Sequence, residues 1–223
     1  MQQGDYGPLW IRADVQTSGR GRRDREWVSK SGNLYASGLY PYAGEPRQAA
    51  LISFVAALAI ADLVCEYVPT DKIALKWPND VLIDGAKTSG VLLERGEGWI
   101  IIGIGVNLMS HPDNTEYPAT HIMAHIPPDE INAPEPCIPE RQAALAILAA
   151  RFDHWFNILK SKGFKPIQEA WLAKAHNIPG PVTVRMPNES FSGEALTLGE
   201  NGELQVRTNN GTIRDVHSGD VFF

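Results

Sequence analysis

The chain has 223 residues, of which 43% are hydrophobic and 21% are charged. This is the composition of an ordinary globular protein, and it excludes a disordered tail or a collagen-like repeat. The 20 basic and 26 acidic side chains give a net charge of −6, so binding of nucleic acid by general electrostatics would need a locally basic face.

The cysteine count and the apolar runs indicate a cytoplasmic protein. Cys65 and Cys137 are too few for a disulfide scaffold. The longest apolar run, residues 49–65, is interrupted by Ser53 and Asp62 and is shorter than the roughly 20 residues of a membrane span. The first ten residues do not follow the pattern of a secretory signal. We therefore expect no membrane segment.

The first third of the chain predicts strands around one long helix. Residues 9–15 and 33–40 predict two strands, and a polar, glycine-rich loop separates them at residues 16–32. Residues 47–68 are apolar on nearly every side and rich in alanine and leucine. That pattern predicts a deeply buried helix.

The next segments predict a series of strands. Residues 72–77 predict a short strand, and residues 81–83 and 90–94 predict a hairpin around the Asp84-Gly85 turn. Residues 99–106, WIIIGIGV, are continuously apolar, which predicts a central strand buried on both faces. The two glycines inside this strand indicate close approach by a ligand or by other backbone.

The second half of the chain changes character twice. Residues 110–139 contain seven prolines and predict a long functional loop with at most one short element. Residues 140–162 and 166–175 predict two helices. After them a meander of five strands predicts a small β-barrel. These strands are expected at residues 182–186, 192–198, 203–208, 212–216 and 221–223. We expect a first domain at residues 1–177 and a second at 178–223.

A nine-residue string, GRGRRDREW at Gly19 to Trp27, carries four arginines. Glycine lets backbone N–H groups approach a ligand closely. The guanidinium fork binds carboxylate or phosphate oxygens, and Trp27 offers a flat apolar face for a base. The string therefore favours an anionic ligand with an aromatic part, such as a nucleotide. Its composition fits a solvated basic loop or an RNA-contacting patch equally well.

Two further strings carry candidate residues. In KWPNDVLIDGAKTSGVLLE, residues 76–94, Lys87 follows the hairpin turn and is placed to reach back over the sheet. Lys76 and Lys87 also fit ordinary surface lysines, and Asn79 and Asp80 fit turn residues. In IIIGIGVN the glycines lie within a strand and a third glycine is missing, so it is not a dinucleotide fingerprint.

The histidines give no convincing metal site. His121 and His125 have i, i+4 spacing and Cys137 lies nearby in sequence, but the segment is broken by prolines and shows no fourth ligand. We make no metal assignment.

Taken in order, the three strings resemble the catalytic core of biotin protein ligases, which biotinylate the carrier domain of acetyl-CoA carboxylase. The resemblance covers nearly the whole chain, from about Trp10 to the C-terminus. It implies an α+β fold: a mixed sheet with helices, related to class II aminoacyl-tRNA synthetases, and then a small Src-homology-3-like β-barrel. It also implies two steps, activation of biotin by ATP to biotinyl-5'-AMP and transfer to a lysine of the biotin carboxyl carrier protein. Mg²⁺ would accompany the ATP.

The resemblance also assigns roles to residues. It implies catalytic roles for Lys87, Arg20, Arg22 and Asp80, with Asp80 facing the incoming carrier lysine. The implied biotin contacts are Gln16, Thr17, Gly19, Arg20, Gly21, Arg22, Lys87, Gly90, Gly103 and Gly105. The implied ATP or adenylate contacts are Arg22, Arg23, Arg25, Trp27, Asn79, Lys87 and Asn107.

The chain departs from the family pattern at its start. The family carries a Ser-Thr-Asn motif upstream of the arginine string, and this chain has no such tripeptide. The resemblance therefore implies an N-terminally shortened core whose pocket lacks one wall, without an N-terminal helix-turn-helix that would bind DNA. Asp24 stands where the family usually has glycine, next to Arg23 and Arg25. An incomplete sheet edge would also allow a homodimer.

Two other functions remain open at this point. One is a lipoate ligase or octanoyl transferase of the same fold family. The other is a catalytically impaired module that binds biotin or nucleotide without turnover. The GRGRR string and the KWPND string favour biotin over lipoate.

Overall fold

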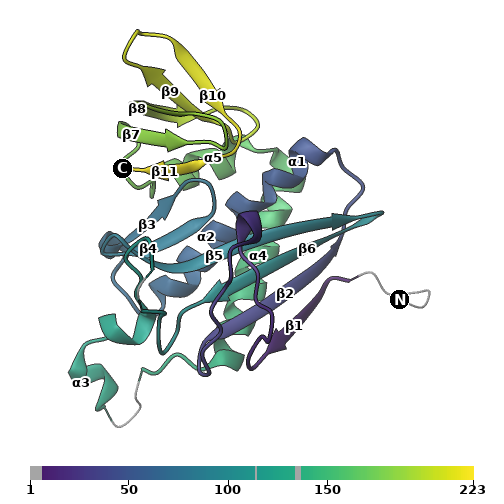
Figure 1. Cartoon of the computed structure of the whole chain (residues 1–223). Helices are drawn as coiled ribbons and strands as arrows, with labels where there is room; N and C mark the ends of the chain where they lie inside the picture. The colour runs from purple at the N-terminus through teal and green to yellow at the C-terminus, as the bar shows by residue number, and fades with distance from the viewer. Residues whose placement is uncertain (1–6, 114, 134–136) are drawn as a thin grey trace.

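The computed structural model describes residues 7–113, 115–133 and 137–223, with the side chain of Asp24 left out. Two antiparallel sheets make up the fold (Figure 1), and the helices pack against the larger of them. The expected α+β architecture is confirmed.

The larger sheet has six strands in the order β1-β2-β6-β5-β4-β3. Its strand pairs are antiparallel. The strands are β1 (Leu9–Ala13), β2 (Leu34–Pro41), β3 (Ile73–Lys76), β4 (Asp80–Ile83), β5 (Ala86–Gly96) and β6 (Trp99–Val106). All six lie where the sequence predicts strands, because their apolar alternation and the Asp84-Gly85 turn are strong local signals.

One expectation about β6 is wrong. The strand is buried on one face only, and its burial alternates along the chain. Ile100, Ile102 and Ile104 point into the core, whereas Gly103 and Gly105 lie on the other face, which borders a cavity. Side chains of successive strand residues point to opposite faces. The isoleucines therefore pack against the helices, and the glycines leave the opposite face open.

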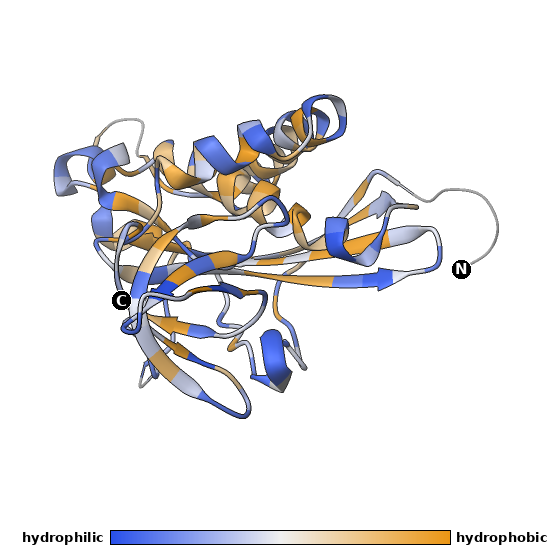
Figure 2. Cartoon of the chain, turned by 90° about the horizontal axis from the view of Figure 1, so that it is seen from above, coloured by the Kyte–Doolittle hydropathy of each residue, from blue (hydrophilic) through white to orange (hydrophobic). Residues whose placement is uncertain are grey.

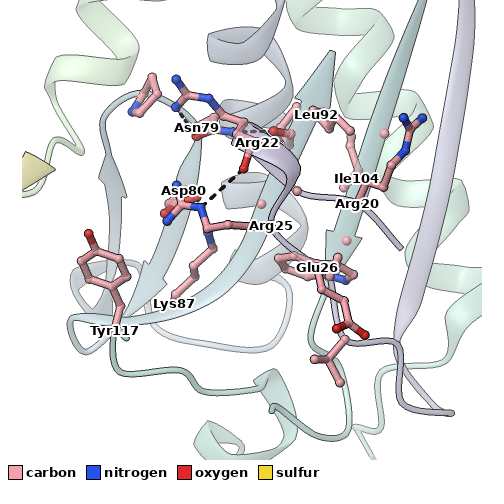
Figure 3. A pocket seen from close by; sticks show the side chains of 18 of the residues that line it. Arg20, Arg22, Arg25, Glu26, Asn79, Asp80, Lys87, Leu92, Ile104 and Tyr117 are labelled. Atoms are coloured by element: carbon pink, nitrogen blue, oxygen red, sulfur yellow. Dashed lines mark hydrogen bonds and ion pairs between the residues drawn. The ribbon is translucent and has the colours of Figure 1, made fainter. Parts of the chain in front are cut away.

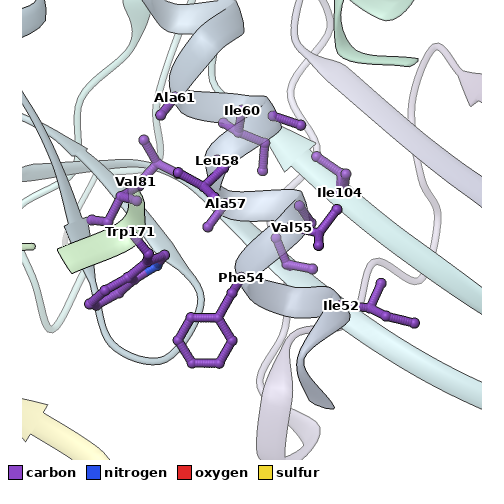
Figure 4. Close-up of a cluster of buried hydrophobic side chains, with 14 of the residues drawn as sticks. Ile52, Phe54, Val55, Ala57, Leu58, Ile60, Ala61, Val81, Ile104 and Trp171 are labelled. Carbon is purple, nitrogen blue, oxygen red and sulfur yellow. The ribbon is translucent and has the colours of Figure 1, made fainter. Parts of the chain in front are cut away.

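The predicted helix at residues 47–68 is divided at Leu51 into α1 (Pro46–Ala50) and α2 (Ile52–Cys65). The expectation of deep burial is confirmed, since 11 of the 14 residues of α2 are buried. Figure 4 shows the side chains of this helix in the core beside Ile104 and Trp171. By length and composition residues 46–65 would suffice to cross a membrane, but most of this stretch is buried inside the fold, as in the core helix of a soluble protein.

The helices α4 (Arg141–Lys162) and α5 (Lys165–Leu172) complete the core. Figure 2 shows hydrophobic residues concentrated where helices and the larger sheet meet. The polar Asp62 in α2 is explained by α4, because Trp155 Nε1 donates a hydrogen bond of 2.8 Å to Asp62 Oδ2. Tyr40 on β2 likewise donates to Asp153 on α4 at 2.6 Å. The first bond joins the helices α2 and α4, and the second joins α4 to the larger sheet.

The proline-rich segment holds two short helices rather than at most one. A 3₁₀ helix, η3, spans Ile122–His125, and α3 spans Pro128–Ile131. Two other 3₁₀ turns, η1 (Arg22–Asp24) and η2 (Thr70–Lys72), lie in the arginine string and before β3. Residues 114 and 134–136 of the proline-rich segment lie outside the described residues.

The second sheet contains the five expected strands. They are β7 (Gly180–Arg185), β8 (Ser190–Leu198), β9 (Leu204–Thr208), β10 (Ile213–Val216) and β11 (Asp220–Phe222), in the order β10-β9-β8-β7-β11. Within residues 180–223, all of which are described, β10 and β11 form two edges. The sheet is therefore open, and the expected barrel is not confirmed. The domain boundary at residue 178 stays a prediction.

The two sheets are joined at a buried contact. Trp77, directly after β3, donates its indole N–H to the carbonyl oxygen of Gly202 at 2.9 Å. Gly202 has a φ of +78°, and a Cβ there would clash with the ring of Phe54 in α2. Only glycine combines this backbone conformation with so close an approach. The turn between β8 and β9 therefore rests directly on the core.

Replacing a buried leucine of α2 should reveal how much the fold depends on this core. We expect Leu58→Ala, at a residue that is 1% exposed, to lower the free energy of unfolding by about 2–5 kcal/mol because it leaves a cavity. Ile213→Ala on β10, at a residue that is 55% exposed, is the control and should change it by less than about 0.5 kcal/mol. Urea denaturation followed by circular dichroism measures both. If the two substitutions lowered the free energy of unfolding equally, α2 would not be the centre of the hydrophobic core.

Candidate active site

A cavity of about 540 Å³ lies on the open face of the larger sheet. Its walls come from the arginine string, from β5 and β6, from the β3–β4 turn and from residues 112, 115–117 and 119. The start of β11 in the second sheet closes one side. Figure 3 shows Arg22, Arg25, Asp80 and Lys87 around this space. Thirteen predicted site residues line it: Gln16, Arg20, Gly21, Arg22, Arg25, Trp27, Asn79, Asp80, Lys87, Gly90, Gly103, Gly105 and Asn107.

The floor of the cavity is a patch of glycines covered by Trp27. A Cβ built on Gly90 would lie 3.1 Å from the Trp27 ring, and one on Gly105 would overlap that ring. The close approach that the glycines of β6 indicate is therefore made by this indole at Gly105, whereas a Cβ on Gly103 would meet Leu92. Trp27 Nε1 is buried without a hydrogen-bond partner among the described residues. A buried N–H group without a partner is energetically costly, so this donor is available to an acceptor that enters the cavity.

The arginine string forms a loop closed on itself. The N–H of Trp27 donates to the carbonyl oxygen of Gly19 at 2.9 Å, and that of Gly21 donates to Arg25 at 2.6 Å. A Cβ on Gly19 would clash with the carbonyl oxygen of Trp27, so glycine is required at the base. Arg23 has a φ of +55°, in the left-handed region that costs a side-chain-bearing residue about 1–2 kcal/mol. The narrow loop therefore holds its arginines close together.

The four guanidinium groups of the loop differ in their surroundings. Arg22 lies deepest, and burial lowers the pKa of its guanidinium, an effect that Asp80 opposes. Its Nη1 donates to Asn79 Oδ1 at 3.4 Å. Arg20 turns toward β5 and pairs with Glu94 at 2.7 Å. Arg23 and Arg25 both pair with one carboxylate, that of Asp220.

Lys87 is fixed by its backbone and pairs with Asp80. Its N–H donates to the carbonyl oxygen of Pro118 at 2.8 Å, and its own carbonyl oxygen accepts from Thr120 at 2.9 Å. The ammonium lies 2.7 Å from Asp80 Oδ1 and 3.5 Å from the position that a Cβ on Gly90 would occupy. The proline-rich segment therefore holds Lys87 over the glycine floor.

The two predicted asparagines support neighbouring segments. Asn107, at the end of β6, donates through Nδ2 to the carbonyl oxygen of Thr120 at 3.0 Å. Asn79 donates through Nδ2 to the carbonyl oxygen of Val91 while it accepts from Arg22. Both are buried, and their side-chain amides hold the proline-rich segment and Arg22 in place.

Three predicted residues do not line the cavity. Thr17 is exposed, and Gly19 lies at the base of the loop. The Arg23 side chain turns to Asp220 beside the cavity. The side chain of Asp24, which stands where the family usually has glycine, lies outside the described residues.

The predicted set does not include several residues of the cavity wall, among them Lys76, Tyr117 and Asp220. Lys76 and Tyr117 lie side by side, with the ammonium 4.2 Å from the ring centroid, and Asp220 comes from the second sheet. Burial lowers the pKa of Lys76 and raises the pKa of Tyr117 to about 12. Lys76 could have been found from the sequence, because the turn in KWPND pairs it with Asp80 between β3 and β4. No pattern in the sequence pointed to Tyr117 or Asp220.

The histidines interact with one another and with other side chains. The Nδ1 atoms of His111 and His121 are 2.8 Å apart, and burial lowers the pKa of His121. His125 contacts Thr120 at 2.8 Å and Asp84 at 3.4 Å. In the described part of the chain no group of three or more His, Cys, Asp or Glu side chains could hold a metal ion.

Comparisons with known proteins agree with this geometry. Residues 2–107 match the Biotin/lipoate A/B protein ligase family, and residues 181–223 match the biotin protein ligase C-terminal domain. The chain is 36% identical to a biotin–[acetyl-CoA-carboxylase] ligase of Paracoccus denitrificans, over 100% of this chain and 93% of that protein. It is 30% identical to the bifunctional ligase/repressor of Bacillus subtilis, of which it spans 65%.

Comparison with solved structures points to the same family of proteins. The structure of a biotin protein ligase from Aquifex aeolicus in complex with biotin and ATP superposes with a TM-score of 0.76 at 27% identity, covering 99% of this chain and 90% of that one. Fold and sequence agree along nearly the full length, and the charged strings that suggested the resemblance lie together in one cavity. This chain belongs to the biotin protein ligase family.

Proposed function

We propose that this protein is a biotin–[acetyl-CoA-carboxylase] ligase. It activates biotin with ATP to biotinyl-5'-AMP and pyrophosphate, and then transfers biotin to a lysine of a carrier protein in the cytoplasm. The observation that carries the proposal is the convergence of Arg20, Arg22 and Lys87 on a single cavity whose floor is glycine. The ligase names and the biotin- and ATP-bound structures among its relatives support it.

The difficulty of the first step is the approach of two anions. At about 4 Å a carboxylate and a phosphate repel by about 4 kcal/mol at an intermediate dielectric. Cations that meet the developing charge offset this repulsion most strongly in the transition state. We assign Lys87 to the space between the biotin carboxylate and the α-phosphate, and Arg22 to the phosphate. Because the backbones of Lys87 and Arg22 are held in place, these residues position the reactants as well as supplying positive charge.

The second step needs a neutral amine. Asp80 lines the cavity 2.7 Å from Lys87, and it is 21% exposed, so an incoming lysine can reach it. We assign Asp80 to orient the carrier amine and to accept its proton. Lys76 beside it, whose pKa burial lowers, adds positive charge that favours the neutral form of that amine.

The cavity divides into two parts in this proposal. Biotin lies on the glycine floor, where its ring system replaces or stacks on the Trp27 indole, and the nucleotide lies toward Asn79 and the arginines. Mg²⁺ rides on the ATP phosphates with few protein ligands. The carboxylates that line the cavity include those of Asp80 and Asp220, and both of these are engaged by cations of the protein.

Replacing Lys87 tests the first step. We expect Lys87→Ala to slow biotin-dependent pyrophosphate release by about 100- to 1000-fold, the usual loss for one charge-stabilising donor. The midpoint of thermal unfolding should change little, because the contacts that hold this residue in place are made by its backbone. Lys72→Ala, at a surface lysine outside the cavity, is the control and should keep full activity. A loss of thermal stability in proportion to activity would instead make Lys87 structural.

Substrate choice separates the alternatives. We expect pyrophosphate release from ATP with biotin and little with lipoate or octanoate, because the arginine loop and the glycine floor are the features that favour biotin. Release with lipoate would assign the chain to the other branch of its family. Biotin binding in calorimetry without any release would indicate a binding module.

The edge of the larger sheet favours a homodimer. β1 is an edge strand, and its Leu9 and Ile11 are 49% and 59% exposed, a combination that favours pairing with a second copy. We expect sedimentation equilibrium to give twice the chain mass. We expect Ile11→Lys to shift it toward the monomer, and a monomeric wild-type protein would refute this part of the proposal.

A further inference from the structure

The second sheet reaches the cavity through a carboxylate at the start of β11. Asp220 Oδ1 lies 2.8 Å from Arg25 Nη2, and Asp220 Oδ2 lies 2.9 Å from Arg23 Nη1. The two arginines therefore share one carboxylate, each through a separate oxygen. The Asp220 side chain is 21% exposed, the lowest value among the groups in these pairs, so the interaction is only partly screened by water.

Among the described residues, two other side-chain hydrogen bonds connect arginines of the loop to the rest of the protein. Arg20 pairs with Glu94 on β5, and Arg22 donates to Asn79 at the long distance of 3.4 Å. The Arg25 Nε bond to the carbonyl oxygen of Arg22, also 3.4 Å, lies within the loop. Among the described residues, Asp220 is the ion-pair partner of both outer arginines. It is thus their anchor to the rest of the fold.

The charge of Asp220 also offsets repulsion inside the loop. Arg23 and Arg25 each lower the pKa of Arg22, and Asp220 acts in the opposite sense. Without this carboxylate, three guanidinium groups would lie next to one another beside a cavity that also holds Lys76 and Lys87. Repulsion of this kind would push the loop outward into solvent.

Asp220 leaves donors free for a phosphate. A guanidinium group has five N–H donors, and Asp220 takes one donor from each arginine. An anion in the cavity can therefore bind Arg25, which lines it, without displacing the carboxylate. This arrangement suits a residue that positions the arginines rather than one that competes with the ligand.

The strand that carries Asp220 is itself fixed to the cavity rim. Its Phe222 ring lies 5.4 Å from the ring of Tyr117, and the guanidinium of Arg185 lies 4.5 Å from the Phe222 centroid. Arg185 also pairs with Glu116 at 3.2 Å. The carboxylate is therefore presented from a strand with its own contacts to residues 116 and 117.

We propose that Asp220 is a positioning residue for ATP: it holds Arg23 and Arg25 at the cavity, so that the second sheet takes part in binding the triphosphate. The inference rests on the proposed function for its ligand. It predicts that ATP affinity, and not biotin affinity, depends on a residue outside the sheet that forms the cavity floor.

Substitution by the isosteric amide tests this role. We expect Asp220→Asn to raise the KM for ATP roughly 10-fold, from the loss of two partly exposed ion pairs. kcat should stay within about 2-fold, because the arginines are still present once ATP saturates the site. The Kd for biotin in calorimetry should be unchanged. Asp220→Glu should recover part of the ATP affinity, because it restores the charge.

The control is Asp215→Asn in the same sheet. Asp215 is exposed on β10 and pairs with Gln205. Its substitution removes one negative charge at a position away from the cavity, and should leave the KM for ATP, kcat and the Kd for biotin unaltered. An unchanged KM for ATP in Asp220→Asn, or equal effects of the two substitutions, would overturn the proposal. A parallel loss of biotin affinity and thermal stability would do so as well, because it would mean a purely structural contact.

Limited proteolysis separates this inference from the proposed function. The loop offers trypsin four arginines, and loops that open more often are cut faster. We expect Asp220→Asn to speed cleavage after Arg23 and Arg25 by several-fold, measured by mass spectrometry without any substrate. Faster cleavage in a chain whose wild type releases no pyrophosphate would refute the ligase assignment and keep the anchoring role. Unchanged cleavage would refute the anchoring itself.

Discussion

The site depends on holding several cations against one another beside a single cavity. Four of these cations are paired with carboxylates of the protein. Arg20 pairs with Glu94, Lys87 with Asp80, and Arg23 and Arg25 with Asp220. The three carboxylates come from β5, β4 and β11, so the positive charge is balanced from three directions before any anion binds. Such fixed charges need little reorganisation when the ligand arrives, which is the condition for electrostatic stabilisation of a transition state.

One face of the larger sheet packs in the hydrophobic core, and the other borders the ligand cavity. The isoleucines of β6 pack against α2 on one face, and the glycines of the same strand form the floor of the cavity on the other. Because a strand alternates its side chains with period two, one segment of eight residues serves the core and the ligand at once. A side chain at Gly90 or Gly105 would meet the Trp27 ring, so glycine at these positions keeps the floor of the cavity free of further side chains.

Local signals predicted most of this arrangement, and the failures have physical causes. The strands, the buried helix and the Lys87 hairpin follow from apolar patterns and turn residues, and the resemblance added the role of Asp80. The two-sided burial expected for β6 was wrong because composition cannot tell an apolar face covered by helices from one that borders a cavity. The break at Leu51 and the open second sheet also depend on packing between distant segments, for which a single sequence gives no periodic signal.

Asp220 illustrates the limit most directly. It lies 197 residues from Arg23 and 195 from Arg25 in the chain, and nothing around it in the sequence marks it as part of a nucleotide site. Its position follows only from the docking of the second sheet, where Trp77 bonds to Gly202 and Phe222 meets Tyr117. The second sheet therefore contributes to the site through rigid placement of one charge. A structural junction far along the chain thus sets the electrostatics of a loop near its start. A change at Gly202 or Phe222 would alter the cavity although neither residue lines it.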